Sequence, residues 1–172
     1  MTYGNDAEKP IYRLLYFSRA HFDTIARMDQ AIPEILGVAR PENSKRGITG
    51  CLLACNGWFI QTLEGERDAV RTLFEKIRGD ARHEDVTLVK TGKAEARAFP
   101  LWSMCGQELS PADDAVVALL AKGAAFDARK LQPQQAVALL QRIQFFQEWQ
   151  RDHPSGGLTH AAINTTALHY SS

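Results

Sequence analysis

The sequence predicts an α+β fold in which helices cover a mixed β-sheet. Three observations lead to this prediction. Short runs rich in β-branched and aromatic residues alternate with amphipathic runs. Asn56-Gly57, the strongest short-range hairpin signal, separates two of the strand-like runs. Residues 66–80 carry apolar side chains at helical spacing. A chain of 172 residues can bury one core of its own and still carry additional helices.

The first predicted strand is followed by a short helix. Residues 11–18 (IYRLLYFS) are β-branched and aromatic and have polar flanks, which is typical of a strand. After a polar stretch, residues 31–40 have helical apolar spacing, and Pro33 suits the first turn of a helix. We expect Pro41 to end this helix, because the residue before a proline avoids the helical conformation.

A hairpin, a second helix and two strands come next. Residues 48–55 and 57–65 lie on either side of the Asn-Gly turn and are expected to pair antiparallel. The helix covers residues 66–80, and the two further strands cover 85–92 and 98–104. The order βαββαββ predicts a ferredoxin-like sandwich with a mixed five-stranded sheet and both helices on one face.

The composition changes after about residue 106. Residues 110–123 begin with a Ser N-cap and an acidic first turn, and residues 132–152 carry a long apolar stripe, so both predict helices. We expect these helices to cover the second face of the sheet, which carries Trp58 and Ile60. The predicted organisation is a disordered N-terminus, a domain, a helical extension and a disordered tail, over residues 1–9, 10–106, 107–152 and 153–172.

Charge, hydropathy and cysteine spacing exclude several functions. The formal net charge is zero, so nothing indicates nucleic acid or an anionic membrane as a partner. No signal peptide or apolar run of membrane-spanning length is present, and we expect a cytoplasmic protein. Cys51 and Cys55 would lie roughly 13 Å apart on one strand, too far for a disulfide. With Cys105 they form no metal-binding cluster, so we predict buried core cysteines and no metal.

Gln61 is out of place on an apolar strand face. It lies between Phe59 and Leu63, and all three point to the same side. Burying an unpaired amide costs about 1–3 kcal/mol, so a polar partner is expected. Tyr16 is a candidate, and the remaining capacity of the amide implies a third polar group. Asn43 is a second amide with no evident local role except in a turn or cap. In the alternative interpretation, Gln61 bonds a backbone carbonyl, Tyr16 reaches solvent and Asn43 only turns the chain.

The order of several short motifs resembles one known family. Tyr16 lies in LLYFS, Asn43 precedes GITG, and Gln61 lies in FIQTLEG. EKIRGDARH and FPLWSM follow, so the stretches span roughly the first 105 residues in one uninterrupted order. Each motif is weak alone, but the ordered set resembles the BLUF domain, a flavin-binding sensor of blue light.

The resemblance implies a flavin between the two predicted helices of the domain. FAD is favoured by family precedent, with FMN as the alternative. Asn43 matches an asparagine that binds the polar edge of the ring, while Ile35 and Phe59 match residues that line the pocket. A charged group is placed near the ribityl and phosphate end: Lys76, Asp80, Arg82 and His83. The alternative for this group is a solvated helix end with cations at its C-terminus.

The resemblance also implies a light-driven hydrogen-bond switch. The excited flavin would take an electron from Tyr16, whose proton would pass through the amide of Gln61. Both would then return, leaving Gln61 rotated or tautomerised and donating to a flavin carbonyl, which shifts the absorption to the red. Trp102 and Met104 match the pair that responds to the switch, and either can face the pocket. Trp102 is alternatively a plain core aromatic.

The expected output is a contact rather than a reaction. No recognisable effector motif lies in residues 106–152, so we predict a sensor and not an enzyme. A downstream protein would be contacted in a light-dependent way, around Phe145 and Trp149, and a homo-oligomer is expected. Two alternatives are a flavin-dependent redox enzyme and a ferredoxin-like interaction module without a cofactor.

Overall fold

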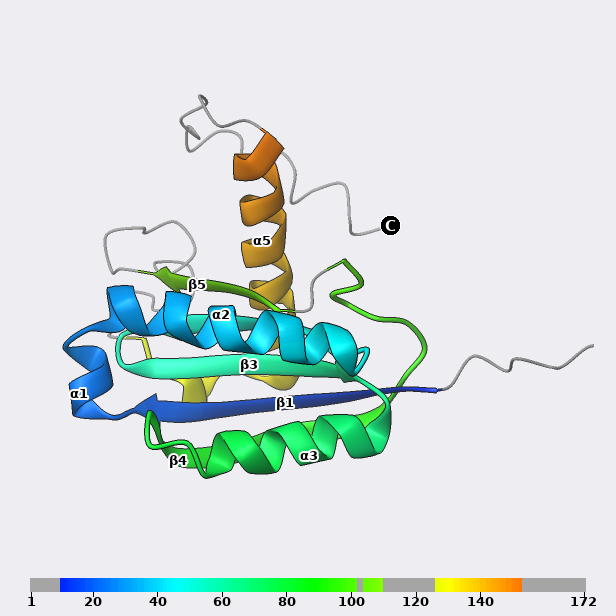
Figure 1. The fold of residues 1–172 in the computed structure, drawn as a ribbon, viewed down its shortest axis with the longest axis horizontal. Helices are drawn as coiled ribbons and strands as arrows, with labels where there is room; N and C mark the ends of the chain where they lie inside the picture. Colours follow the sequence, from blue (N-terminus) through cyan, green and yellow to red (C-terminus); the bar gives the residue numbers. More distant parts are fainter. Residues whose placement is uncertain (1–9, 102–103, 110–125, 153–172) are drawn as a thin grey trace, which may run out of the picture.

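One mixed sheet organises the domain. A computed structural model describes residues 10–101, 104–109 and 126–152. Its strands lie in the order β4-β1-β3-β2-β5 (Figure 1). They are β1 Ile11–Ala20, β2 Thr49–Cys55, β3 Trp58–Gly65, β4 His83–Ala94 and β5 Cys105–Leu109. β5 pairs parallel with β2, and the remaining pairs are antiparallel. The predicted α+β class is therefore confirmed.

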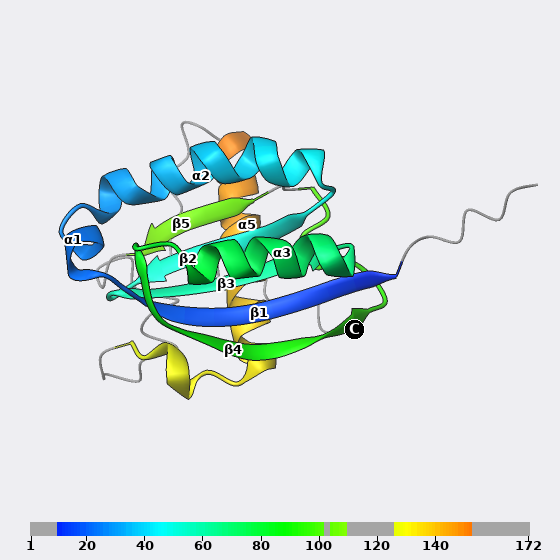
Figure 2. The same cartoon turned by 60° about the horizontal axis from the view of Figure 1, so that its bottom comes forward.

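Two helices cover one face of the sheet and leave its middle strand between them. α2 (Met28–Lys45) packs on β2 and β5, whereas α3 (Arg67–Arg78) packs on β1, β3 and β4. A short helix, α1 (Phe22–Ile25), leads into α2. Figure 2 shows α2 and α3 side by side over the same face. The central strand β3 thus presents its residues between the two helices.

The opposite face is covered by the C-terminal part of the chain. α5 (Pro133–Asp152) follows a 3₁₀ turn, η1 (Ala128–Lys130), and crosses behind the sheet (Figures 1 and 2). Leu140 and Ile143 of α5 are buried in one apolar cluster with Trp58 and Ile60 of β3. Of the two C-terminal helices expected on this face, the second, at 132–152, is confirmed, and the first, at 110–123, lies outside the described residues. Cys51 belongs to the same cluster, in line with a buried core cysteine.

The predicted hairpin turn is confirmed. Asn56 and Gly57 have φ angles of 49° and 73°. Positive φ at both central positions is the requirement of the type I′ turn, which asparagine and glycine tolerate best. The turn sets the β2–β3 register, in which Leu52 lies opposite Gln61.

The helix after β1 is longer than the sequence predicted. α2 continues through Pro33 and Pro41 to Lys45, so the prediction that Pro41 ends it was wrong. A proline inside a helix removes the donor to the carbonyl four residues earlier, here that of Gly37. Gly37 is exposed, so water can replace the missing donor. As a result, Asn43 lies in the last turn of α2 rather than beyond the helix.

The last strand begins later than predicted. Residues 98–101 are not a strand, and β5 starts at Cys105. The main-chain N–H groups of Ala98 and Phe99 donate to the carboxylate of Glu64, at 2.9 and 3.0 Å. Pro100 has no N–H to offer a neighbouring strand. A buried side chain therefore takes the hydrogen bonds that a strand partner would have taken.

Several expectations fall outside the part of the chain that the structure describes. They are the disordered ends at 1–9 and 153–172, the helix at 110–123, and the position of Trp102. Among the described helices, none has the length and hydrophobicity needed to cross a membrane.

Candidate functional site

Tyr16 and Gln61 meet on the helix-covered face of the sheet. They lie directly opposite each other on the neighbouring strands β1 and β3. The Tyr16 hydroxyl donates a hydrogen bond to Oε1 of Gln61. Tyr16 is 0% exposed and Gln61 5% exposed. The expected pair is confirmed, and the alternative in which Tyr16 reaches solvent was wrong.

The other end of the Gln61 amide points at Met104. Nε2 of Gln61 donates to the Met104 sulfur at 3.2 Å. Met104 is fully buried and directly precedes β5. A thioether is a weak acceptor, so this contact uses little of the donor capacity of the amide. Of the two residues left open by the sequence, Met104 faces Gln61, while Trp102 lies beyond the described residues.

Arg40 holds the backbone that carries Met104. Its Nε donates to the Met104 carbonyl oxygen at 3.0 Å, which ties α2 to the start of β5. Arg40 was not among the site residues predicted from the sequence. Arg40 lies one helical turn before Asn43, a spacing that would have placed the two side chains on one helix face. Because the predicted helix ended at Pro41, Arg40 and Asn43 were not expected to lie on the same helix.

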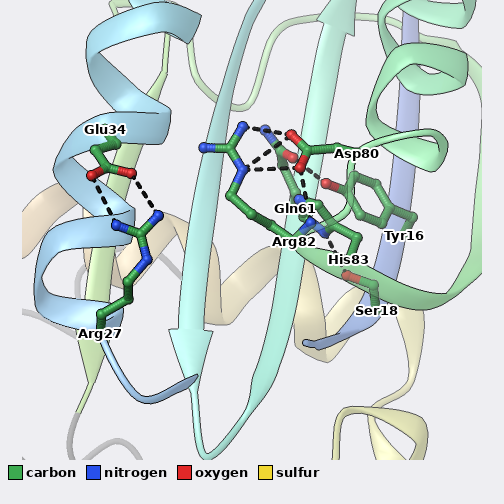
Figure 3. Close-up of polar contacts among 8 residues, drawn as sticks. All are labelled: Tyr16, Ser18, Arg27, Glu34, Gln61, Asp80, Arg82 and His83. Atoms are coloured by element: carbon green, nitrogen blue, oxygen red, sulfur yellow. Dashed lines mark hydrogen bonds and ion pairs between the residues drawn. The ribbon is translucent and has the colours of Figure 1, made fainter. Parts of the chain in front are cut away.

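A second polar group lies at the end of α3 and the start of β4. The main-chain N–H and the guanidinium of Arg82 both donate to the carboxylate of Asp80, at 2.9 Å from each nitrogen (Figure 3). Nδ1 of His83 and the Ser18 hydroxyl share a hydrogen bond of 2.8 Å. Ser18 was also missed, although strand alternation places it on the same face as Tyr16.

Burial decides the charge of the two rings in this site. It raises the pKa of Tyr16 far above the usual value for a phenol, and nearby Asp80 raises that pKa further. Burial also lowers the pKa of His83 to about 4; Asp80 opposes this shift and Arg82 adds to it. The His83 ring centroid lies 4.7 Å from that of Phe59. At neutral pH the phenol keeps its proton and the imidazole is uncharged.

The remaining predicted residues divide into a buried and an exposed set. Asn43 is 1% exposed in the last turn of α2, and Phe59 is fully buried. Ile35 is half-buried against the same apolar cluster as Phe59. Lys76, by contrast, is exposed on α3. The structure thus gathers the amides, the phenol and the apolar residues on one face and leaves the lysine at the surface.

The family follows from comparison with known sequences. The sequence profile of the BLUF family, described as sensors of blue-light using FAD, matches residues 11–105. The chain belongs to the BLUF family. The matched range contains Tyr16, Gln61, Asn43 and Met104, so the site described above lies inside the BLUF domain. FAD, the cofactor favoured from the sequence, is the family's cofactor.

The chain is similar to part of one much longer protein and to nearly the whole of two short ones. Subunit beta of photoactivated adenylate cyclase from Euglena gracilis is 42% identical over 87 residues, which is 51% of this chain but only 10% of that protein. The photo-activated state of BlsA superposes with a TM-score of 0.66 and 28% identity, covering 77% of this chain and 94% of BlsA. The dark-state structure of the BLUF protein BlrB superposes with a TM-score of 0.61 and 31% identity, covering 81% of this chain and 98% of BlrB.

The buried polar groups suit the edge of a flavin ring. Gln61 contacts Tyr16 and Met104 of the apolar cluster, and Asn43 is a second buried carboxamide in the last turn of α2. The Gln61 N–H group has a thioether as acceptor where a carbonyl would be stronger. Two surface grooves, of about 300 and 500 Å³, contain none of Tyr16, Gln61 or Asn43. The proposed fit to a flavin therefore rests on the buried polar side chains of Gln61 and Asn43 and not on either of these grooves.

Proposed function

We propose that this BLUF domain senses blue light through a hydrogen-bond switch at Gln61 and signals to a partner protein. One observation carries the proposal. Gln61 accepts a hydrogen bond from Tyr16 with one end of its amide and donates to Met104 with the other. A single rotation or tautomer change of this amide would alter both contacts at once.

The chain's own groups support a reversible electron and proton transfer. When bound, FAD absorbs blue light and becomes a strong oxidant. The raised pKa of Tyr16 keeps the phenol protonated in the dark. Loss of an electron makes a phenol strongly acidic, and Oε1 of Gln61 is the acceptor already in contact with its proton. The proton returns to the tyrosine oxygen when the electron returns. No covalent bond between the flavin and the protein would therefore be formed.

The amide is the side chain that this switch requires. Leucine carries no exchangeable proton, glutamate introduces a charge into an apolar cluster, and asparagine is one methylene shorter. Gln61 lies among fully buried residues such as Phe59 and Leu63. Hydrogen bonds are stronger and more selective where water is excluded.

The route of the signal starts at Met104. Its sulfur contacts the amide, and its backbone leads directly into β5. α5 packs on β2, β3 and β5 from the other face of the sheet. A change at Gln61 would reach α5 through these strands, and the exposed ring of Phe145 on α5 would contact the partner. We propose that this protein contact, and not an enzymatic reaction, is the output of the sensor. We also propose that the protein forms a homo-oligomer and is located in the cytoplasm.

An absorption spectrum before and after illumination tests the proposal. A yellow protein with a small, reversible red shift supports it. A protein without a bound flavin, or one that bleaches and then turns over with an added reductant, contradicts it. Because α5 covers an apolar core, deleting the helix would expose that core. Phe145→Glu, compared in dark and light by pull-down, tests the partner contact without this problem.

A further inference from the structure

A groove runs along the outer side of α3. It encloses about 500 Å³ between α3, β1 and the edge strand β4. Buried apolar side chains such as Leu14 and Phe74 contribute to its lining. Three arginines of α3 line it as well: Arg67, Arg71 and Arg78. The groove is thus apolar at its base and basic along one wall.

The charge of this groove is unbalanced although the chain is neutral. Glu75 is the acidic residue among the lining side chains, and it pairs with Arg78 at 3.2 Å. Arg67 and Arg71 are exposed and one helical turn apart. Two positive charges therefore face the groove without an acidic counterpart in its lining. An anionic ligand is the complement of this wall.

The opposite wall is an open strand. Within the described sheet, β4 is an edge strand that pairs only with β1. It is 12 residues long, whereas exposed edges are usually kept short to prevent pairing with other chains. Leu88 on β4 lines the groove and is 49% exposed. A free row of main-chain donors and acceptors beside an apolar side chain is the arrangement that binds an extended peptide.

We propose that β4 and the basic wall of α3 bind an acidic, extended segment of a partner protein. The segment adds to the sheet as a strand beside β4, its apolar side chains face Leu88 and the groove floor, and its carboxylates meet Arg67 and Arg71. A peptide matches the site better than a nucleic acid or a lipid surface, because only a peptide can use the hydrogen-bonding edge of β4. In register, Leu88 lies opposite Tyr16 on β1, so the bound strand would lie one strand away from the phenol.

Calorimetric titration of the whole chain tests this site. The probe is a capped decapeptide of alternating Glu and Val, and the comparison peptide has Lys in place of Glu. We expect the Lys peptide to bind at least ~10-fold more weakly. Reversing both charges, Arg67→Glu with Arg71→Glu, should weaken binding of the acidic peptide by ~10-fold, and Gln at both positions by less. Arg142→Glu, an exposed arginine on α5, is the matched control and should change nothing.

Two further probes separate strand addition from simple charge attraction. The acidic peptide with N-methyl groups on all backbone amides should not bind, since it has no N–H to donate to β4. The proposal is overturned if that peptide binds as well as the parent, if the Lys peptide binds equally, or if the double charge reversal has no effect. It is also overturned if phosphatidylserine vesicles, rather than the acidic peptide, bind in a manner that depends on Arg67 and Arg71.

Discussion

Gln61 on β3 and Met104, which directly precedes β5, are 43 residues apart in the sequence and are joined by a hydrogen bond of 3.2 Å. Together with the Tyr16 hydroxyl, the Met104 sulfur defines one orientation of the buried amide. Both contacts join side-chain atoms, so breaking them leaves the main-chain hydrogen bonds of the strands in place. The orientation of the amide can therefore change without unfolding the strands that carry it.

Removing either partner of the switch should leave a coloured but silent protein. In Gln61→Leu or Tyr16→Phe, the apolar walls between α2 and α3 remain, so we expect the flavin to stay bound and the red shift to disappear. Tyr12→Phe, on the same strand and partly exposed, is the control and should keep the shift. Difference absorption spectra after a blue flash measure this. A full red shift in Gln61→Leu would rule out the proposed switch.

Met104→Leu should slow the return to the dark state. Leucine keeps the approximate volume, which usually costs under about 1.5 kcal/mol of stability. It removes the sulfur that accepts from Nε2 of Gln61. Because a thioether is a weak acceptor, we take the low end of the usual hydrogen-bond contribution, about 0.5 kcal/mol, and expect recovery slower by ~2-fold. The recovery of absorption in darkness after a flash is the measurement. Met28→Leu, a buried methionine of the same cluster, serves as the comparison, and an equal effect there would contradict a specific role for the sulfur.

Arg40→Met should loosen the segment that carries Met104. The substitution keeps an apolar stem but removes the donor to the Met104 carbonyl, so the free energy of unfolding should fall by about 1 kcal/mol. Recovery in darkness should change in the same direction as in Met104→Leu. Arg27→Met is the control, because Arg27 forms an exposed ion pair with Glu34 on α2 (Figure 3). Urea unfolding and the recovery of absorption after a flash are measured on both variants. If Arg40→Met behaves like Arg27→Met, Arg40 does not hold the segment that carries Met104.

Glu64→Gln should destabilise the fold more than any exposed charge change. Its fully buried carboxylate accepts from Arg13 Nε at 2.6 Å and from the N–H groups of Ala98 and Phe99. An amide in its place turns an NH₂ group toward these donors. Because Arg13 remains partly solvated, we expect a loss of about 2–3 kcal/mol. Glu75→Gln, which breaks only an exposed pair, should cost under about 1 kcal/mol in the same urea titration.

Stability should decrease in mildly acidic solution because of His83. Its pKa is lowered by burial from 6.5 to about 4 in the folded chain, so the unfolded chain binds more protons between these values. The free energy of unfolding is therefore largest above pH 6.5, falls as the pH decreases toward about 4, and stops falling on this account below that. Urea titrations between pH 4 and 7.5 measure the decline. His83→Gln should flatten it, and parallel pH profiles for the two proteins would contradict the cause.

The order of elements and the central pair could be predicted from the sequence because they depend on local chemistry. Strand alternation placed Gln61 on the same face as Phe59, and the hairpin turn followed from the backbone freedom of Asn56-Gly57. The stripe of α3 likewise follows from residues three and four apart. Each of these features is decided by neighbours in the chain.

Long-range contacts decided the rest. Packing on β2 and β5 carries α2 through Pro41, against the local preference of proline, and so puts Arg40 and Asn43 on one helix. The carboxylate of Glu64, 34 residues away, takes the N–H of Ala98 and delays β5. A hydrogen bond or a buried surface between distant segments exists only once the chain has folded, and no pattern of neighbouring residues contains it.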